Sequence, residues 1–336
     1  MATLNSLEFT GSYNSFNGSL FSTQNTSSAG LLFYSGSDFY FTSQNAATWS
    51  LTSANKAQRR AYSGGVGDQS EFLEWGGEVP NIGFSNTSCI YNGSSWANGP
   101  NMTTTGRGYM GSFGTTNNAI SAGGGLQPNG NIPTNATEEY NGSSWSSGGN
   151  MITGLKWLGA AGQSGDAGIV FGGKTYPSSN LCPCRCTETY DGTSWTTQGP
   201  LIVGAECTTG FGTQNDAVKV AGKAWGSCNS PYGGINQNWR VEGWDGIGWS
   251  TLANTDYTPG IQCVAMGLSS NEGQSMNRSK NTGYNGIAWY SKPTIPTTVQ
   301  SGAMGNNAQM GAGIAPSSCC TLLESIDTNI VIKKLS

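Results

Sequence analysis

The chain has 336 residues, of which 51 are glycine and 10% are charged, and its formal net charge is −4. This composition argues against a helical bundle and a nucleic-acid-binding protein, and the 10% of aromatic residues argues against disorder. Histidine is absent, which removes the usual general base and the usual metal ligand. We therefore expect many short strands joined by tight turns.

The N-terminal region is polar and shows no targeting signal. Residues 1–5 are not followed by the apolar stretch of a secretory signal, and no apolar run approaches the ~18 residues that cross a bilayer. We expect synthesis in a cytoplasm, with no signal peptide and no membrane span. Residues 1–30 are predicted to be a polar arm that docks on a partner or packs beside the first repeat, or else a partly mobile terminus.

A six-residue motif recurs along the chain and organises it. Two copies read Tyr-Asn-Gly-Ser-Ser-Trp, and the others are conservative, looser or degenerate. The copies occupy residues 34–39, 91–96, 140–145, 190–195, 244–249 and 284–289. From the second copy on, successive starts are 49, 50, 54 and 40 residues apart. A period of roughly 40–50 residues with only strand and turn signals predicts propeller blades of four strands.

Each repeat shows the same order of strand signals. It begins at a tryptophan, at Trp49, Trp96, Trp145, Trp195, Trp249 and Trp289. A short strand then ends in glycine, at Gly67, Gly114, Gly162, Gly212, Gly267 and Gly305. A turn rich in Asn, Asp and Gly follows, then an apolar strand such as 167–173, a variable loop, and a third strand that leads into the motif.

This order resembles the kelch repeat, in which an apolar strand ending in Gly-Gly precedes a spaced tyrosine and tryptophan. The resemblance covers roughly residues 34–330 and is strongest in the second, third and fourth units. It implies an all-β fold, a six-bladed β-propeller of four-stranded antiparallel blades over residues 31–336. We expect the ring to be closed by N- and C-terminal strands, with 322–327 pairing with 33–41. The alternative is that 330–332 supplies its own last strand.

The six repeated tryptophans are expected to be structural. Each buried indole removes ~150–250 Å² from water. Replacing one by alanine should cost ~3–5 kcal/mol and weaken its own blade first.

No group of residues predicts catalysis. The kelch-like family includes a copper radical oxidase, but its site needs histidines, and this chain has none. The turn at 191–195 is one residue shorter than the box found in sialidase propellers. A glycosidase needs two cooperating carboxylates, whereas Glu138 and Glu188 recur in register with the repeat, which favours a scaffold role. We expect neither a catalytic residue nor a cofactor.

The one unusual local cluster consists of Cys182, Cys184 and Cys186. Alternation in an extended segment would direct all three sulfur atoms to one side. We expect no metal, because the spacing differs from the two-residue gap of zinc knuckles and no histidine completes a ligand set. The sequence leaves three alternatives for these cysteines. They are a soft-metal site, a disulfide, including one to Cys228, and free thiols.

The loop before the motif varies most between repeats. It grows from 14 residues between Gly77 and Tyr91 to 22 between Gly222 and Trp244. In a propeller these loops emerge on one face, and the longest carry the predicted binding residues Tyr176, Trp225, Tyr232 and Trp239. Exposed aromatic rings among Asn, Ser and Gly suit a sugar ring or a protein partner. The alternative is that these rings fold back over their own loops.

Polar, charge-poor kelch-like chains of this kind resemble virion proteins of tailed bacteriophages, especially marine ones. The resemblance implies a non-enzymatic structural protein of the virion, in a tail, fibre, collar or head decoration. Its expected partners are other virion proteins in a homo- or hetero-oligomeric assembly, and a host-surface glycan or receptor. The alternative is a carbohydrate-binding lectin or glycan-active enzyme on a propeller scaffold, and a cellular kelch-repeat adaptor is a third hypothesis.

Overall fold

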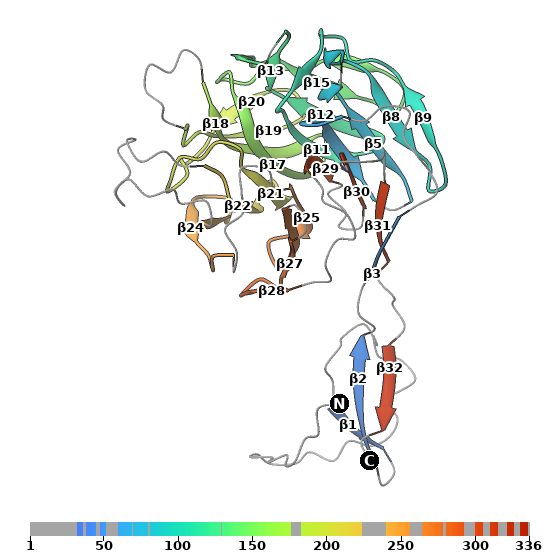
Figure 1. Cartoon of the computed structure of the whole chain (residues 1–336). Helices are drawn as coiled ribbons and strands as arrows, with labels where there is room; N and C mark the ends of the chain where they lie inside the picture. The colour runs from blue at the N-terminus through green and yellow to red at the C-terminus, as the bar shows by residue number, and fades with distance from the viewer. Residues whose placement is uncertain are drawn as a thin grey trace. The chain divides into compact units, whose positions relative to one another are not determined.

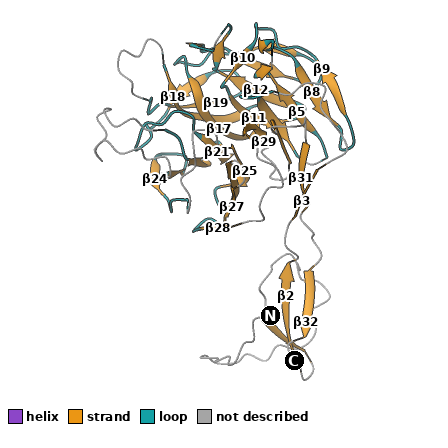
Figure 2. Cartoon of the chain, in the orientation of Figure 1, coloured by secondary structure: helices purple, strands orange, loops and turns teal. Residues whose placement is uncertain are grey.

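The computed structural model contains strands and loops and no helix among the residues that it describes (Figure 2). These are residues 32–35, 38–44, 48–51, 60–68, 70–79, 81–128, 130–175, 183–223, 240–255, 264–277, 280–291, 300–304, 310–314, 321–325 and 330–334. The predicted all-β class is therefore confirmed for this part of the chain. Within it, no helix is long and apolar enough to cross a membrane.

The described strands form six antiparallel sheets of four strands each (Figure 1). The first sheet comprises β4 (Gly64–Gly67), β5 (Phe72–Trp75), β8 (Ser88–Tyr91) and β9 (Trp96–Gly99). The second comprises β11 (Gly111–Thr115), β12 (Asn118–Ala122), β15 (Thr137–Tyr140) and β16 (Trp145–Ser147). The third comprises β17 (Lys156–Ser164), β18 (Ala167–Lys174), β19 (Thr187–Tyr190) and β20 (Trp195–Thr197).

The other three sheets repeat this order. The fourth comprises β21 (Thr209–Thr213), β22 (Asp216–Val220), β23 (Val241–Trp244) and β24 (Trp249–Thr251). The fifth comprises β25 (Val264–Ser269), β26 (Glu272–Asn277), β27 (Lys280–Tyr284) and β28 (Trp289–Ser291). The sixth comprises β29 (Gln300–Met304), β30 (Met310–Ile314), β31 (Thr321–Ser325) and β3 (Thr48–Leu51).

Smaller sheets accompany the four-stranded ones. They are β6 (Glu78–Val79) with β7 (Gly83–Phe84), and β10 (Arg107–Gly108) with β13 (Gly125–Leu126) and β14 (Ile132–Pro133). A separate compact unit contains the sheet of β1 (Leu32–Ser35), β2 (Asp38–Gln44) and β32 (Ile330–Lys334). The six four-stranded sheets belong to the other unit, residues 48–325.

The recurring motif forms the turn between the third and fourth strands of a sheet. In the second sheet Tyr140 lies opposite Trp145. Between them the Asn141 Oδ1 atom accepts the N–H groups of Ser143 at 3.0 Å and Ser144 at 2.9 Å. An aspartate oxygen accepts the same bonds, which explains why asparagine and aspartate alternate at this position between copies. Gly142 has a φ of 89°, a left-handed value that glycine adopts without strain.

The first strands of the sheets contact one another in sequence. β4 contacts β11, β11 contacts β17, β17 contacts β21, β21 contacts β25, β25 contacts β29, and β29 contacts β4. The outermost strands are then the fourth strands, which carry the repeated tryptophans.

Aromatic side chains hold neighbouring sheets together. Trp195 on β20 donates from Nε1 to Thr137 Oγ1 and to the Gly149 carbonyl, both at 2.9 Å, and both acceptors lie in or next to the preceding sheet. Its ring centroid is 6.2 Å from that of Phe113 in the same preceding sheet. Phe113 in turn packs so tightly that a Cβ added to Gly168 would overlap its ring. Small residues are therefore required where the sheets meet.

The pairing of the chain ends differs from the prediction. β31, at 321–325, pairs with β3, and the segment at 38–44 pairs with β32 instead. In Figure 1 the red β31 lies beside the blue β3. The reason lies in the repeat itself. Trp49 of β3 sits opposite Glu324, as Trp145 sits opposite Tyr140 in the second sheet. The tryptophan strand of the sixth sheet thus comes from the N-terminal side of the repeats, so residues 330–332 do not supply it.

Candidate binding site on the loop face

The connections within residues 48–325 lie at two ends of the strands. The hairpins between first and second strands, and between third and fourth strands, lie at one end, which we call the turn face. The connections from second to third strands, and from one sheet to the next, lie at the other end, which we call the loop face. This follows from the antiparallel order of each sheet.

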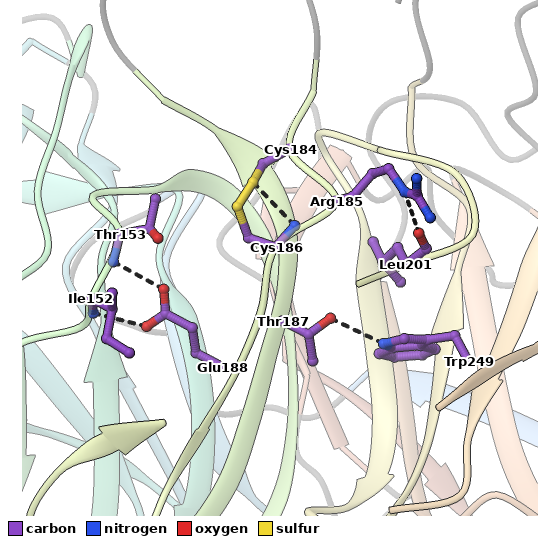
Figure 3. The surroundings of a disulfide bond; sticks show 9 residues. All are labelled: Ile152, Thr153, Cys184, Arg185, Cys186, Thr187, Glu188, Leu201 and Trp249. Carbon is purple, nitrogen blue, oxygen red and sulfur yellow. Dashed lines mark hydrogen bonds between the residues drawn. A yellow bond between two sulfur atoms is a disulfide. The ribbon is translucent and has the colours of Figure 1, made fainter. Parts of the chain in front are cut away.

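Three recurrent glutamates tie the connections between sheets in place. They occupy the second position of the third strand in the second, third and fourth sheets, at Glu138, Glu188 and Glu242. Glu188 accepts the backbone N–H groups of Ile152 and Thr153, both at 2.9 Å (Figure 3). Glu242 accepts the equivalent groups of residues 202 and 203. Each glutamate therefore binds the connection that enters its own sheet.

Glu138 makes the densest set of these contacts. Its Oε2 atom accepts from Thr103 N at 2.6 Å and Thr103 Oγ1 at 2.7 Å, and its Oε1 atom lies 3.0 Å from Arg107 Nη2. Both partners of the ion pair are buried. Burial lowers the pKa of Arg107 to about 10, although Glu138 opposes that shift. The carboxylate oxygens are occupied by protein donors, which is a scaffold use of these residues.

The four aromatic residues predicted to bind a ligand, Tyr176, Trp225, Tyr232 and Trp239, lie outside the described residues. Of the repeated tryptophans, Trp145 and Trp195 are buried and Trp96, Trp249 and Trp289 are half-buried. For Trp49 only the backbone strand is described. Trp249 donates from Nε1 to Thr187 Oγ1 of the preceding sheet at 3.0 Å (Figure 3).

Cys184 and Cys186 form a disulfide with each other on the stem of a long loop (Figure 3). Their Cα atoms are 5.2 Å apart, within the range that a disulfide spans. Cys184 and Cys186 therefore pair with each other and not with Cys228. Cys182 and Cys228 lie outside the described residues. The described residues hold no group of three acidic, cysteine or histidine side chains placed to bind a metal.

A cluster of three aromatic residues lies on the loop face, which we call the axial aromatic cluster. Its members precede or begin the first strands of three successive sheets, at Tyr62, Tyr109 and Trp157. Ring centroids are 4.5 Å apart for Tyr62 and Tyr109, and 5.3 Å apart for Tyr109 and Trp157. All three side chains are half-buried. Because the first strands contact one another, the cluster joins three sheets at their innermost edges.

The backbone of this cluster is left-handed. The φ values are 58° at Tyr62, 62° at Tyr109 and 60° at Trp157, and Cys207, before the first strand of the fourth sheet, follows with 55°. The Tyr109 N–H donates to the Tyr62 carbonyl at 3.0 Å, and the Trp157 N–H donates to the Tyr109 carbonyl at 2.9 Å. These bonds hold each residue in a conformation that costs a bulky side chain about 1–3 kcal/mol.

Two lysines flank the indole of Trp157. The Lys156 Nζ atom is 4.5 Å and the Lys174 Nζ atom 5.8 Å from the ring centroid. Glu206 lies 3.6 Å from the Lys174 ammonium. Lys156 is buried, and both its desolvation and the nearby charge of Lys174 lower its pKa. The site therefore places two ammonium groups beside its aromatic surface.

Tyr109 at the centre of the cluster is held in its neutral form. Burial raises its pKa to about 12, and Tyr62, Glu78 and Cys207 add to the shift. The phenol is therefore protonated across the physiological range and can donate a hydrogen bond. Neutral hydroxyl donors beside ring faces suit a polar, partly apolar ligand.

The sequence carried a signal for this cluster that the repeat analysis missed. Arg60 and Arg107 each stand two residues before a tyrosine, at Tyr62 and Tyr109, and those tyrosines are 47 residues apart. Trp157 follows 48 residues later. An aromatic residue therefore recurs at the period of the repeat, just before the first strand or at its start.

No protein-family model and no curated protein matches this chain.

Proposed function

We propose that the chain is a non-enzymatic binding module built on a closed, six-bladed, kelch-like β-propeller, with the axial aromatic cluster as its ligand site. Closure is supported by the contacts of the six first strands, which return from β29 to β4, and by the pairing of β31 with β3. A closed ring removes the unpaired strand edges that an open array of sheets would expose.

The observation that carries the binding proposal is the strained backbone at Tyr62, Tyr109 and Trp157. Glycine adopts this conformation without cost, and the chain has glycine at many other left-handed positions. Aromatic side chains held there at about 1–3 kcal/mol each imply a use for the rings beyond packing. Half-buried rings at the innermost edge of a binding fold suit recognition of a ligand.

The proposed ligand is a sugar. Tyr and Trp rings offer flat apolar surface together with O–H and N–H donors, which matches the mixed apolar and hydroxyl faces of a pyranose. The long loops of the same face are rich in Asn, Ser and Gly, whose amide and hydroxyl groups supply adaptable hydrogen bonds.

In this proposal the module is a structural component of the virion of a tailed bacteriophage, in a tail, fibre, collar or head decoration. Support comes from the polar, charge-poor composition and from the type of repeat. The separate sheet of β1, β2 and β32 gives the chain a second part that could attach to other virion proteins. The ligand would then be a glycan of the host surface.

The binding proposal is tested by titrating the purified protein against a panel of soluble oligosaccharides, with calorimetry as the readout. Trp157→Ala should weaken binding of any active oligosaccharide at least tenfold, a loss of about 1.4 kcal/mol or more. The matched control is Tyr290→Ala, which removes an exposed aromatic ring from β28. Equal affinity of Trp157→Ala and the wild type would contradict the proposed site.

The assembly proposal has its own test. The protein should co-sediment with phage particles and release no product from any oligosaccharide of the panel. Sugar binding without co-sedimentation would favour the lectin alternative. Turnover that disappears on removal of one carboxylate would favour a glycan-active enzyme and refute the non-enzymatic proposal.

A further inference from the structure

We infer that the ligand of the axial aromatic cluster is an acidic sugar, whose carboxylate or sulfate group is bound by the ammonium of Lys174 beside the ring of Trp157. The inference rests on the proposed function and adds the chemical class of the ligand. It is carried by the placement of the two lysines of the cluster and by the partners of Lys174.

Lys156 and Lys174 lie directly opposite each other across the β17–β18 pair. Like charges at such cross-strand positions repel each other and destabilise the pair. Both ammonium groups also lie near the same indole. Among the described residues, Glu206 forms an ion pair with Lys174, so two positive charges lie beside one negative charge. A bound anion would balance the remaining positive charge.

The ammonium groups of the two lysines differ in how many hydrogen-bond acceptors lie near them. The Lys156 Nζ atom lies 3.0 Å from the Gly130 carbonyl, 3.2 Å from the Asn131 carbonyl and 3.5 Å from Asn131 Oδ1. Three acceptors match the three N–H donors of an ammonium group. Lys156 therefore contributes a fixed positive field and not a direct bond to the ligand.

Lys174 is the group that can bind directly. Its side chain is 18% exposed, and among the described residues its nearest charged partner is Glu206 at 3.6 Å. That separation exceeds the ~2.7–2.9 Å of a charge-assisted hydrogen bond. A largely desolvated ammonium with only a loose partner is poised to take a closer anionic one.

The distribution of charge on the surrounding surface also favours an anionic ligand. On the loop face, three cationic residues that are not buried outnumber the exposed carboxylate of Glu78. They lie at or beside the stems of the loops around β18, β19, β22 and β23, at Lys223, Arg185 and Arg240. On the turn face, the described hairpins between first and second strands carry carboxylates and no lysine or arginine. These carboxylates are Asp68, Glu71, Asp166, Asp216 and Glu272. An anionic ligand is therefore repelled from the turn face and attracted to the loop face.

The test uses matched pairs of acidic and neutral oligosaccharides with the full-length protein. The pairs are oligogalacturonate and its methyl ester, sialyllactose and lactose, and a heparin-derived oligosaccharide before and after chemical desulfation. In at least one pair the acidic member should bind about tenfold or more tightly than the neutral one, the effect of one hydrogen bond to a charged group. That preference should shrink as salt is raised.

Variants then assign the preference to Lys174. Lys174→Met keeps the aliphatic stem and should remove the acidic preference, whereas Lys174→Arg should retain it. Lys223→Met is the matched control, since it removes a neighbouring loop-face charge outside the aromatic cluster, and it should keep the preference. If Lys174→Met is poorly folded, the wild-type comparison within each pair still decides whether the ligand is acidic, and Lys174→Arg still tests the assignment to Lys174.

The outcomes separate the two proposals. Binding of sugars with no acidic preference in any pair would overturn the acidic ligand and leave the sugar site standing. An acidic preference that survives in Lys174→Met would overturn the assignment to Lys174. Failure of every member of every pair to bind would overturn both the acidic ligand and the sugar-binding proposal.

Discussion

Trp195→Ala tests whether the repeated tryptophans hold one sheet together or join two. In the structure Trp195 is 7% exposed, its ring centroid lies 4.8 Å from that of Tyr190 in its own sheet, and its Nε1 atom donates to Thr137 and Gly149. Loss of the buried indole should cost ~3–5 kcal/mol. The two acceptors left behind add roughly 1 kcal/mol each, because Thr137 is itself buried.

The expected destabilisation is therefore about 5–7 kcal/mol, a large part of the stability of a typical domain. Denaturant unfolding measures the total, and hydrogen exchange by mass spectrometry locates it. Exchange should rise in β15 and in the connection around residue 149 of the preceding sheet as well as in β19 and β20. Trp195→Phe is the control, since it keeps an aromatic ring but loses the N–H donor and part of the indole volume, and it should cost about 2–3 kcal/mol, less than Trp195→Ala.

Two results would refute this reasoning. A total loss below about 1 kcal/mol would mean that the indole contributes little, whatever its burial. Faster exchange confined to β19 and β20 would return the tryptophan to the role expected from the sequence, that of holding its own blade.

Three further predictions concern sites where the backbone or a ring sets the outcome. Gly168→Ala should destabilise the protein by about 1–3 kcal/mol or more in an unfolding assay, because the new Cβ overlaps Phe113. A Cβ at Gly248 would meet nothing within 4 Å, so Gly248→Ala should change stability by less than about 0.5 kcal/mol in the same assay. Cys207→Gly should raise the melting temperature, because it relieves about 1–2 kcal/mol of left-handed strain at φ 55°, and this outweighs the roughly 1 kcal/mol of chain entropy that it adds to the unfolded state. Cys207→Ala keeps the strain and should not raise the melting temperature. A lower melting temperature for the glycine variant would contradict the strain argument. Tyr109 should ionise near pH 12 in the folded protein, as read from the ultraviolet absorbance difference between the wild type and Tyr109→Phe, and a component near 10 would contradict its burial. Because the unfolded chain loses this proton first, stability should fall as pH rises from about 10 through 12.

Much of the fold could be predicted from local turn chemistry. The Asn-Gly and Asp-Gly pairs of the motif require a left-handed residue at a fixed place, and they set the register of Tyr140 against Trp145. The glycine near the end of the first strand was also predictable from the turn residues that follow it. Gly114, one residue before the end of β11, has a φ of 107°. These features depend on residues close in sequence, so the period of the repeat carries them.

The pairing of the chain ends depends on contacts that the local sequence does not encode. β31 at 321–325 lacks the aromatic residue that would identify the strand with which it pairs. Both 38–44 and 48–51 are suitable strands. Only the position of Trp49 opposite Glu324 distinguishes them. The candidate site was missed for a related reason. The left-handed backbone occurs just before β11 at Tyr109 and at the start of β17 at Trp157, and residue type does not predict this conformation for an aromatic residue.

The most direct measurement of the central claim is a structure of the protein with a bound oligosaccharide, at crystallographic or cryo-microscopic resolution. We expect sugar density against Tyr109 and Trp157 on the loop face, with an acidic group within hydrogen-bonding distance of the Lys174 Nζ atom. Sugar bound at the turn face, or at a loop remote from these three residues, would contradict it.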